Sequence, residues 1–356
     1  MPGERGGALS ALAFTGLDAG RLGVHRSLEP RGALPHIARV VDATAPINEH
    51  EVEIDVEMLA VDATSFAEIR RRSRSDPDAM ADAIKAIVDE RGKLQNPATG
   101  SGGVAMGRVR TVGAAYSMDD LVPGELVVPL ASLIAIPLAL EAVGPVQPDS
   151  PQVPVRGRAI VTGAMLCARI PSDLPLAVSL TAFDVYPAAS YVRELAGEGD
   201  HVLVLGAGHA GLLALAAARA AVGASGAVTA VDVSGDALDR AAGVAPTATT
   251  VQASVTDPVA VAGALAARGL RPADLTLQCT SADGAEGTAL LATAPRGTVI
   301  FFSTATLFAA AALGADAIGS QARLVIPNGL TEDRGEYALE LLRTVAPLRV
   351  AYGSPS

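Results

Sequence analysis

The chain has 356 residues, of which 38 are acidic and 27 are basic, so its formal net charge at neutral pH is −11. Half of the residues are apolar, enough to bury a sizeable core in about two domains. The negative charge argues against a nucleic-acid partner, since an acidic surface repels a phosphate backbone. Lysine occurs only at positions 85 and 93, so Schiff-base catalysis has just two candidate residues.

The cysteines and the apolar segments predict where the protein resides. Cys167 and Cys279 lie far apart and match no metal or redox spacing. The N-terminal letters MPGERGGALSALAF lack the apolar core of a secretory signal. Residues 126–140 form the longest apolar stretch, but Pro129 and Pro137 interrupt it and it is too short to span a bilayer. We therefore expect a soluble, cytoplasmic protein with no membrane partner.

The first half of the chain is predicted to be rich in strands. Residues 51–60 alternate apolar and polar side chains, as a half-buried strand does. Asp76 and Pro77 then begin a helix, with the Asp as N-cap and the Pro at the first helical position. Further β-like segments lie at 104–113, 125–137 and 158–166. We expect one helix in an otherwise strand-rich domain.

The second half has a different pattern. From residue 171 to 198 the chain is predicted to be helical, and strands then alternate strictly with helices. The last helix is expected to begin with Thr331 as its N-cap. Such alternation predicts right-handed βαβ units, a parallel sheet and the doubly wound α/β fold class. We place the domain boundary near residue 175, which gives a strand-rich substrate and catalytic domain at 1–175 and a nucleotide-binding domain at 176–356.

A glycine-rich turn lies between the first strand and the first helix of this alternation. Its letters fit G-x-G-x-x-G, in which the glycines permit a tight turn, close approach of a pyrophosphate, and close packing of helix on strand. The helix N-terminus attracts the phosphate charge. Asp232 ends the next strand, where a carboxylate binds the ribose hydroxyls and repels a 2′-phosphate. A Rossmann domain that binds NAD rather than NADP is therefore predicted, with a cofactor site that includes Gly206, Gly208, His209, Ala210, Gly211 and Asp232.

A strand-rich half followed by a Rossmann half resembles the medium-chain dehydrogenase/reductase architecture, in which the first domain is GroES-like. The shared phrases include EIDVEMLAVDATSF, MGRVRTVG, VPGELVVP and LTAFDVYPAA. Zinc-dependent members carry a cysteine near the first phrase and a Gly-His-Glu triplet before the second, where this chain has Thr64 and Gly102-Gly103-Val104. A hydroxyl and glycines cannot replace a thiolate and an imidazole as zinc ligands. This resemblance therefore implies a zinc-independent enzyme with no catalytic metal.

A second resemblance covers most of the chain. The stretches GVHRSLEP, LAVDATSF, RGKLQNPATGSGG, FFSTATLFAAAALGADAIG and NGLTEDR are similar to the L-erythro-3,5-diaminohexanoate dehydrogenase family. The resemblance implies NAD-dependent oxidative deamination of a diamino acid at C3, giving 5-amino-3-oxohexanoate, ammonia and NADH, in lysine degradation. Relatives of this architecture are commonly dimers or tetramers, so a homo-oligomer is expected.

The resemblance to medium-chain dehydrogenases indicates candidate catalytic residues. Asp62, Thr64 and Ser65 stand where the zinc-type relatives keep catalytic residues, and Asp62 is expected to act as a base or as an ammonium partner. Asp184 lies in the segment that lines the nicotinamide in such enzymes. A core-facing carboxylate there would be costly without a partner, which favours a functional role.

The implied substrate also calls for a cation that binds its carboxylate. Arg91 and Lys93 are the candidates, together with Asn96 and Ser101 from the same loop. His209 is expected either to touch the phosphates or to be an exposed loop residue. Further cofactor contacts are predicted from residues near the nicotinamide, namely Thr181, Thr280, Ser281, Ser303 and Thr304.

Three alternatives to this function are open at the level of sequence. One is a zinc-independent reductase of the same architecture that acts on an enone, a quinone or another carbonyl. Another is a non-catalytic, NAD-binding or regulatory protein. A third is a homologue in specialised metabolism whose substrate is a modified diamino acid. A cavity with acidic and basic side chains would favour the diamino acid, and a wholly apolar cavity would favour the carbonyl reductase.

Overall fold

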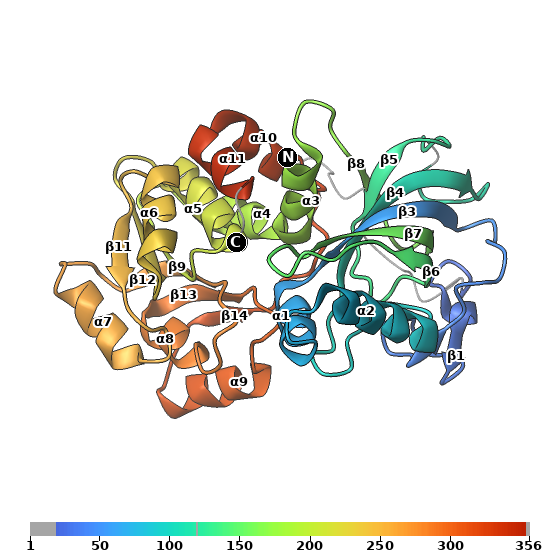
Figure 1. Cartoon of the computed structure of the whole chain (residues 1–356). Helices are drawn as coiled ribbons and strands as arrows, with labels where there is room; N and C mark the ends of the chain where they lie inside the picture. The colour runs from blue at the N-terminus through green and yellow to red at the C-terminus, as the bar shows by residue number, and fades with distance from the viewer. Residues whose placement is uncertain (1–18, 119, 354–356) are drawn as a thin grey trace, which may run out of the picture.

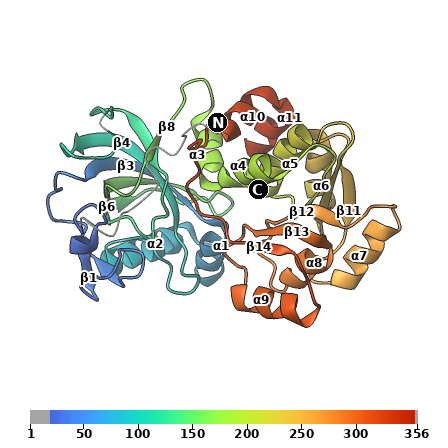
Figure 2. The same ribbon diagram turned by 180° about the vertical axis from the view of Figure 1, so that it is seen from behind.

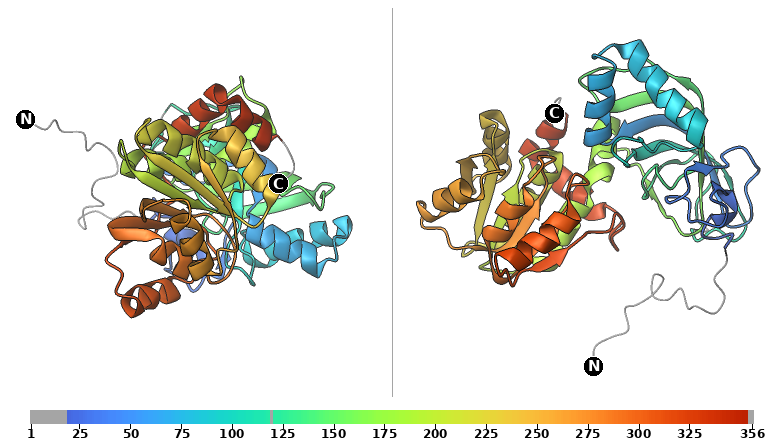
Figure 3. Two further views of the ribbon diagram at one scale, coloured as in Figure 1. Left: turned by 90° about the vertical axis from the view of Figure 1, so that its left-hand side faces the viewer. Right: turned by 90° about the horizontal axis from the view of Figure 1, so that it is seen from below.

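The protein contains two six-stranded sheets, one from each half of the chain (Figure 1). The computed structural model describes residues 19–118 and 120–353. The blue-to-green first half and the yellow-to-red second half lie side by side, as Figure 2 shows from behind and Figure 3 from below. The predicted fold class, an α/β protein with a strand-rich part before a doubly wound sheet, is confirmed.

The first sheet is antiparallel throughout and has the strand order β6-β7-β3-β4-β5-β8. Its strands are β3 (Val52–Val61), β4 (Gly103–Val112), β5 (Leu126–Pro129), β6 (Leu138–Val143), β7 (Gln152–Val161) and β8 (Cys167–Arg169). A short 3-10 helix, η1 (Val24–Arg26), and a two-stranded sheet of β1 (Ser27–Glu29) and β2 (Val40–Val41) precede it.

β3 has the alternating pattern that its sequence predicts, and it ends in a fully buried run. Val52, Ile54 and Val56 are buried between more exposed polar neighbours. Ala60 packs into a core that β3 shares with the second half of the chain, whereas Val61 packs into the core of the first sheet. Both faces of the strand are therefore covered where it reaches the junction of the two halves.

The first half has two helices where one was predicted, α1 (Ala63–Arg72) and α2 (Pro77–Arg91). α2 begins as its sequence predicts, because the Asp76 carboxylate accepts a hydrogen bond of 2.8 Å from the backbone N–H of Ala79. α1 was missed. Its N-cap, Asp62, accepts a 3.0 Å hydrogen bond from the Ser65 N–H, but no apolar run marks this helix in the sequence.

The second sheet is parallel throughout and has the order β11-β10-β9-β12-β13-β14. Its strands are β9 (His201–Leu205), β10 (Ala227–Asp232), β11 (Thr249–Gln252), β12 (Ala273–Gln278), β13 (Thr293–Phe301) and β14 (Arg323–Val325). In chain order this is 3-2-1-4-5-6, the order of a Rossmann dinucleotide-binding fold.

Helices cover both faces of this sheet. The helices of this half are α3 (Leu176–Val185), α4 (Pro187–Leu195), α5 (His209–Val222), α6 (Gly235–Val244), α7 (Pro258–Ala266), α8 (Glu286–Leu291), α9 (Phe308–Ala317), α10 (Glu336–Thr344) and α11 (Ala346–Tyr352). Alternate residues of β9 point to opposite faces of the sheet and belong to different cores. Val202 and Val204 share a core with α3 to α6, α10 and α11. Leu203 shares a core with α7 to α9. α3 and α4 are therefore part of the Rossmann core, and the predicted boundary near residue 175 stays a prediction.

The start of the last long helix differs from the prediction. α10 begins after Gly335, which has a left-handed φ of 88°, rather than at Thr331. Asp333 instead accepts hydrogen bonds from Ser190 Oγ (2.9 Å) and from Arg193 Nη2 (2.9 Å), both on α4. These contacts hold the segment before α10 against α4 in a turn.

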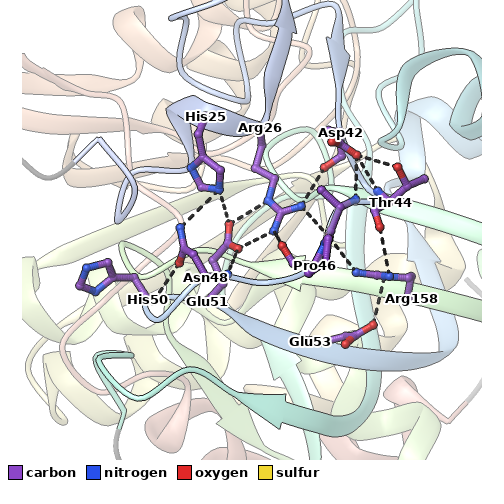
Figure 4. A network of polar contacts seen from close by, with 11 residues as sticks. His25, Arg26, Asp42, Thr44, Pro46, Asn48, His50, Glu51, Glu53 and Arg158 are labelled. Atoms are coloured by element: carbon purple, nitrogen blue, oxygen red, sulfur yellow. Dashed lines mark hydrogen bonds and ion pairs between the residues drawn. The ribbon is translucent and has the colours of Figure 1, made fainter.

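A buried polar network anchors the segment before the first sheet (Figure 4). The Arg26 guanidinium is paired with the buried Glu51 carboxylate at 2.6 Å and donates to the carbonyls of Pro46 (2.7 Å) and Ala45 (3.0 Å). Arg158 on β7 donates to the same Ala45 carbonyl at 3.2 Å. The network therefore ties this segment to the start of β3 and to β7, and it serves the fold rather than the cavity described next.

No helix within residues 19–118 or 120–353 has both the length and the apolarity that crossing a membrane requires.

Candidate active site

A cavity of about 710 Å³ lies at the junction of the two halves. Its walls come from the end of β3, the start of α1, one side of α3, and the loops that follow β9, β12 and β13. β9 is the strand at which the order of the second sheet reverses, and ligands of doubly wound sheets bind at that point. The volume is in the usual range for small-molecule sites.

The three glycines of the turn after β9 serve three different purposes. Gly206 has a φ of 96°, and a Cβ there would lie 3.0 Å from Thr280. A Cβ on Gly211 would lie 1.9 Å from the Gly206 carbonyl oxygen, so α5 can pack this closely only with glycine. Gly208 has no atom within 4 Å of such a Cβ and lines the cavity, leaving space for a ligand at the N-terminus of α5. This geometry fits a pyrophosphate.

Asp232 lies at the end of β10, as predicted, and fixes the same turn. Its Oδ2 accepts a 2.8 Å hydrogen bond from the Ala207 N–H, and its Oδ1 accepts one of 2.8 Å from the Ser234 N–H. Each carboxylate oxygen has a second lone pair, which is free to accept a ribose hydroxyl. The carboxylate can therefore hold the turn and bind a nucleotide at the same time.

His209 is neither solvent-exposed nor in a loop. It is partly buried at the first position of α5, and its ring lies 4.9 Å from the ring of Tyr352, centroid to centroid. Tyr352 Oη also donates a 2.8 Å hydrogen bond to the His209 carbonyl, so α11 covers this end of α5. Burial lowers the pKa of His209, which favours a neutral ring at neutral pH.

Asp62 and its neighbours form a polar cluster at the cavity wall. Asp62 Oδ1 accepts from Ser101 Oγ at 2.9 Å as well as from the Ser65 N–H. Ser65 Oγ in turn contacts Thr99 Oγ1 (2.7 Å) and Ser101 Oγ (2.8 Å). The second oxygen of Asp62, Oδ2, is buried and has no hydrogen-bond partner in the described part of the chain. A buried carboxylate oxygen without a partner is costly, so it is suited to accept from a bound ligand.

Asp184 contributes a second carboxylate to the cavity from α3. Burial, together with the nearby negative charge of Asp62, raises its pKa to about 7. Its side chain has no hydrogen bond to any residue that the structure describes. The structure thus brings together two predicted acids from distant parts of the sequence, one held by hydroxyl groups and one poised to exchange a proton near neutral pH.

Arg91 and Lys93, the predicted carboxylate clamp, do not line the cavity. Lys93 is fully buried, and its Nζ donates to the carbonyl oxygens of Pro35 (2.7 Å) and His36 (3.4 Å). Burial and the charge of Arg91 lower the pKa of Lys93 to about 8. The clamp prediction is wrong for Lys93, because the chain turns back at Gly92 and directs this side chain under the N-terminal segment.

The other predicted residues divide into those in the cavity wall and those behind it. Asn96 is buried away from the cavity and donates to Glu68 Oε2 at 3.0 Å. Thr280 packs behind Gly206, and Ser65 supports Asp62 without lining the cavity. The predicted residues that do line it are Asp62, Thr64, Ser101, Thr181, Asp184, Gly208, His209, Ala210, Ser281, Ser303 and Thr304.

Several polar residues of the wall were missed at the level of sequence, among them Gln147, Asp149, Gln152, Asn328 and Tyr352. Gln152 Nε2, on β7, donates to Thr181 Oγ1 and to the Ala177 carbonyl, each at 2.9 Å, and so joins the first sheet to α3. No local pattern distinguishes these residues from ordinary loop and strand residues.

The positions where zinc-type relatives carry metal ligands do not fit a zinc ion here. A Cβ on Gly103 would lie 2.0 Å from the Ala60 carbonyl oxygen, and the φ of Gly103 is 108°. A histidine therefore has no space at this position. Within residues 19–118 and 120–353, no three His, Cys, Asp or Glu side chains are grouped so as to hold a metal. Zinc independence stays a prediction that this geometry supports.

An antiparallel sheet followed by a Rossmann sheet, with a cavity between them, defines a medium-chain dehydrogenase fold. Galactitol-1-phosphate dehydrogenase from Escherichia coli shares this fold, with a TM-score of 0.52, 18% identity, and coverage of 85% of this chain and 84% of that one.

Two relatives named L-erythro-3,5-diaminohexanoate dehydrogenase are more similar in sequence. The protein from Acetoanaerobium sticklandii is 33% identical over 93% of this chain and 97% of its own length. The protein from Fusobacterium nucleatum is 35% identical over 92% and 96%. The profile of the L-erythro-3,5-diaminohexanoate dehydrogenase N-terminal domain matches residues 25–171. This chain belongs to the L-erythro-3,5-diaminohexanoate dehydrogenase family and is a dehydrogenase, as its sequence predicts.

Proposed function

We propose that the protein oxidises the C3 amine of L-erythro-3,5-diaminohexanoate with NAD, giving 5-amino-3-oxohexanoate, ammonia and NADH in lysine catabolism. The observation that carries this proposal is the pair of carboxylates, Asp62 and Asp184, in the cavity beside the dinucleotide turn. Two anions suit a substrate with two amino groups, and the two relatives carry the name of that substrate.

NAD is the cofactor we propose, because its nucleotide end would meet the Asp232 carboxylate. A 2′-phosphate would be repelled there, and no arginine follows in Val233-Ser234-Gly235. Gly208 and the N-terminus of α5 would hold the pyrophosphate, with Ser281, Ser303 and Thr304 near the nicotinamide end. When bound, NAD supplies the acceptor for the hydride from C3.

Within the cavity we assign different tasks to the two acids. Asp62, fixed by Ser101 and by the N-terminus of α1, binds an ammonium group through its unpartnered Oδ2. Asp184 takes a proton from the C3 ammonium, because only a neutral amine releases a hydride from its carbon. A carboxylate with a pKa of about 7 is well matched to that task. The resulting imine is hydrolysed by water, for which the Thr64 hydroxyl in the cavity wall is a hydrogen-bond partner.

The test is NADH formation from purified protein with 3,5-diaminohexanoate, compared with lysine, β-lysine and simple enones. Oxidation of the diamino acid, well above that of lysine and β-lysine, is expected. No activity on the diamino acid together with robust enone turnover would show that the protein is a carbonyl reductase. Intact NAD binding without turnover of any of these compounds would support the alternative that the protein binds NAD without catalysing a reaction. We also propose a homo-oligomer, which sedimentation in the same buffer tests.

A further inference from the structure

The segment at residues 327–335, between β14 and α10, supplies part of the cavity wall. It contains NGLTEDR, one of the stretches that resemble the diaminohexanoate dehydrogenase family, and this stretch has no task in the function proposed above. Pro327, Asn328 and Gly329 line the cavity. The segment contains neither a helix nor a strand, so its position depends on contacts with neighbouring elements.

Two tyrosines and a carboxylate hold the 327–335 segment against α4. Tyr186, directly before α4, is buried, and its Oη donates to the Gly329 carbonyl at 2.8 Å. Tyr191 Oη, on α4, accepts from the Asn328 N–H at 3.0 Å. Farther along the segment, Asp333 accepts from two side chains of α4, as described above. The segment is therefore fixed at its cavity end and near its far end.

The Asn328 side chain has a defined orientation at this wall. Its Oδ1 accepts a 2.8 Å hydrogen bond from the Leu330 N–H, which only the oxygen of the amide can do. Its Nδ2 makes no hydrogen bond in the described part of the chain, and the residue is exposed where it lines the cavity. The group that remains free, an amide nitrogen, donates hydrogen bonds and cannot accept them.

The substrate proposed above has one group that suits such a donor. At neutral pH the two amino groups of 3,5-diaminohexanoate are ammonium donors, whereas its carboxylate only accepts. The amino groups have the Asp62 and Asp184 carboxylates as partners in the proposed function. A hydrogen bond from an amide to an ionised carboxylate is stronger than one between neutral groups.

We propose that Asn328 binds the carboxylate of the substrate through Nδ2, and that Tyr186 is the positioning residue that keeps Asn328 at the wall. This inference rests on the proposed function and identifies a carboxylate subsite for its substrate. The substrate then lies with its carboxylate at the 327–335 segment and its amino groups at the two acids. Asn328 thereby favours the diamino acid over a diamine that lacks the carboxylate.

The first test compares wild-type protein with Asn328→Asp on two substrates at saturating NAD. One is 3,5-diaminohexanoate, and the other is 2,4-diaminopentane of matching configuration, the same molecule with hydrogen in place of the carboxylate. The substitution keeps an acceptor for the Leu330 N–H but replaces the donor with an anion. We expect kcat/KM for the acid to fall about tenfold or more, because a charged hydrogen bond is lost and like charges meet. For the diamine kcat/KM should stay the same or rise, and the affinity for NAD should stay the same.

The second test uses Tyr186→Phe, which removes the hydroxyl group that contacts Gly329 and keeps the buried ring. KM for the acid should rise several-fold, with little change in kcat or in kcat/KM for the diamine. In combination with Asn328→Asp it should add little, because both changes act on the same contact. Tyr337→Phe is the matched control, since the Tyr337 hydroxyl has no hydrogen bond among the residues that the structure describes, and it should leave both substrates unaffected.

The outcomes separate this inference from the proposed function. An equal fall for the acid and the diamine in Asn328→Asp overturns the inference, and so does a loss of NAD affinity, which would assign the amide to the nicotinamide. Wild-type protein that oxidises the diamine as well as the acid also overturns it. In each of these cases oxidation of the acid by the wild type keeps the proposed function intact. A wild type that binds NAD but does not oxidise the acid contradicts both.

Discussion

Asp62 and Asp184 show how the surroundings of a side chain decide its chemistry. Both are aspartates, and the sequence around each of them does not decide which role it has. Asp62 is held by hydrogen bonds from the Ser101 hydroxyl and from the Ser65 N–H at the N-terminus of α1. Asp184 has no such donors, and burial together with the charge of Asp62 raises its pKa to about 7. The two carboxyl groups therefore differ in their surroundings, which is the basis for the different roles proposed for them, one in binding an ammonium group and one as a base.

The first prediction concerns Asp184 and pH. Its carboxyl group must be ionised to accept a proton, so kcat/KM of the free enzyme should rise with pH through about 7. Asp184→Asn should abolish this rise and lower kcat by about 100-fold or more. The measurement is the pH profile of NADH formation. The matched control is Asp149→Asn, which removes an exposed carboxylate of the same cavity and should keep the rise. An unchanged profile in Asp184→Asn would exclude it as the base.

The second prediction distinguishes a role of Lys93 in stability from a role in substrate binding. Lys93→Met should lower the free energy of unfolding by about 1–3 kcal/mol, because two backbone carbonyls lose a buried donor. KM for the diamino acid should stay the same. Denaturant unfolding and steady-state kinetics measure the two effects. Lys85→Met, on the surface of α2, should alter neither by much, and a large rise in KM for Lys93→Met would restore the clamp role.

At the scale of elements, the turn from β9 to α5 and the end of β10 form one unit. Gly206 and Gly211 are required by close contacts, and Asp232 is hydrogen-bonded into the same turn through Ala207. The sequence predicts this unit well because strand, turn and helix follow each other directly. α1 was missed because its short length and weak apolar pattern give little local signal.

A third prediction tests this unit. Asp232→Ser removes the carboxylate that would bind the ribose. It also removes an acceptor for the backbone N–H groups of the turn. The affinity for NAD should therefore fall about tenfold or more. Binding of NADP should weaken less or improve, since the repulsion of its 2′-phosphate is removed. Titration calorimetry measures both. Asp236→Ser, in the first turn of α6, serves as the control, and equal NAD affinity in both variants would contradict the assignment.

The whole molecule depends on how the first sheet meets the Rossmann half. The cavity exists only at their junction, where β3 and β7 contribute one wall and α3 another. Gln152 crosses this junction with hydrogen bonds to Thr181 and to the Ala177 carbonyl. We expect this contact to hold the wall that carries Asp62 against α3, which carries Asp184.

A fourth prediction follows for Gln152. Gln152→Ala should lower kcat several-fold or more, because small displacements of reacting groups are costly in rate. Thermal stability should change little, since only one half-buried side chain is shortened. The control is Gln147→Ala, in the same wall but without a side-chain hydrogen bond in the described part of the chain. Equal kcat in the two variants would show that the crossing contact does not position the acids.

The sequence by itself determined the fold class, the dinucleotide turn and the family, because each depends on local patterns or on long shared phrases. It also supplied Asp62 and Asp184 as candidates. Only the tertiary structure decided that these two acids share one cavity, that Lys93 points away from it, and that no described Lys or Arg lines its wall. The physical reason is that side chains far apart in the chain meet only through packing. The direction that a loop takes, as after Gly92, is likewise fixed by contacts with distant residues, which no short stretch of sequence contains.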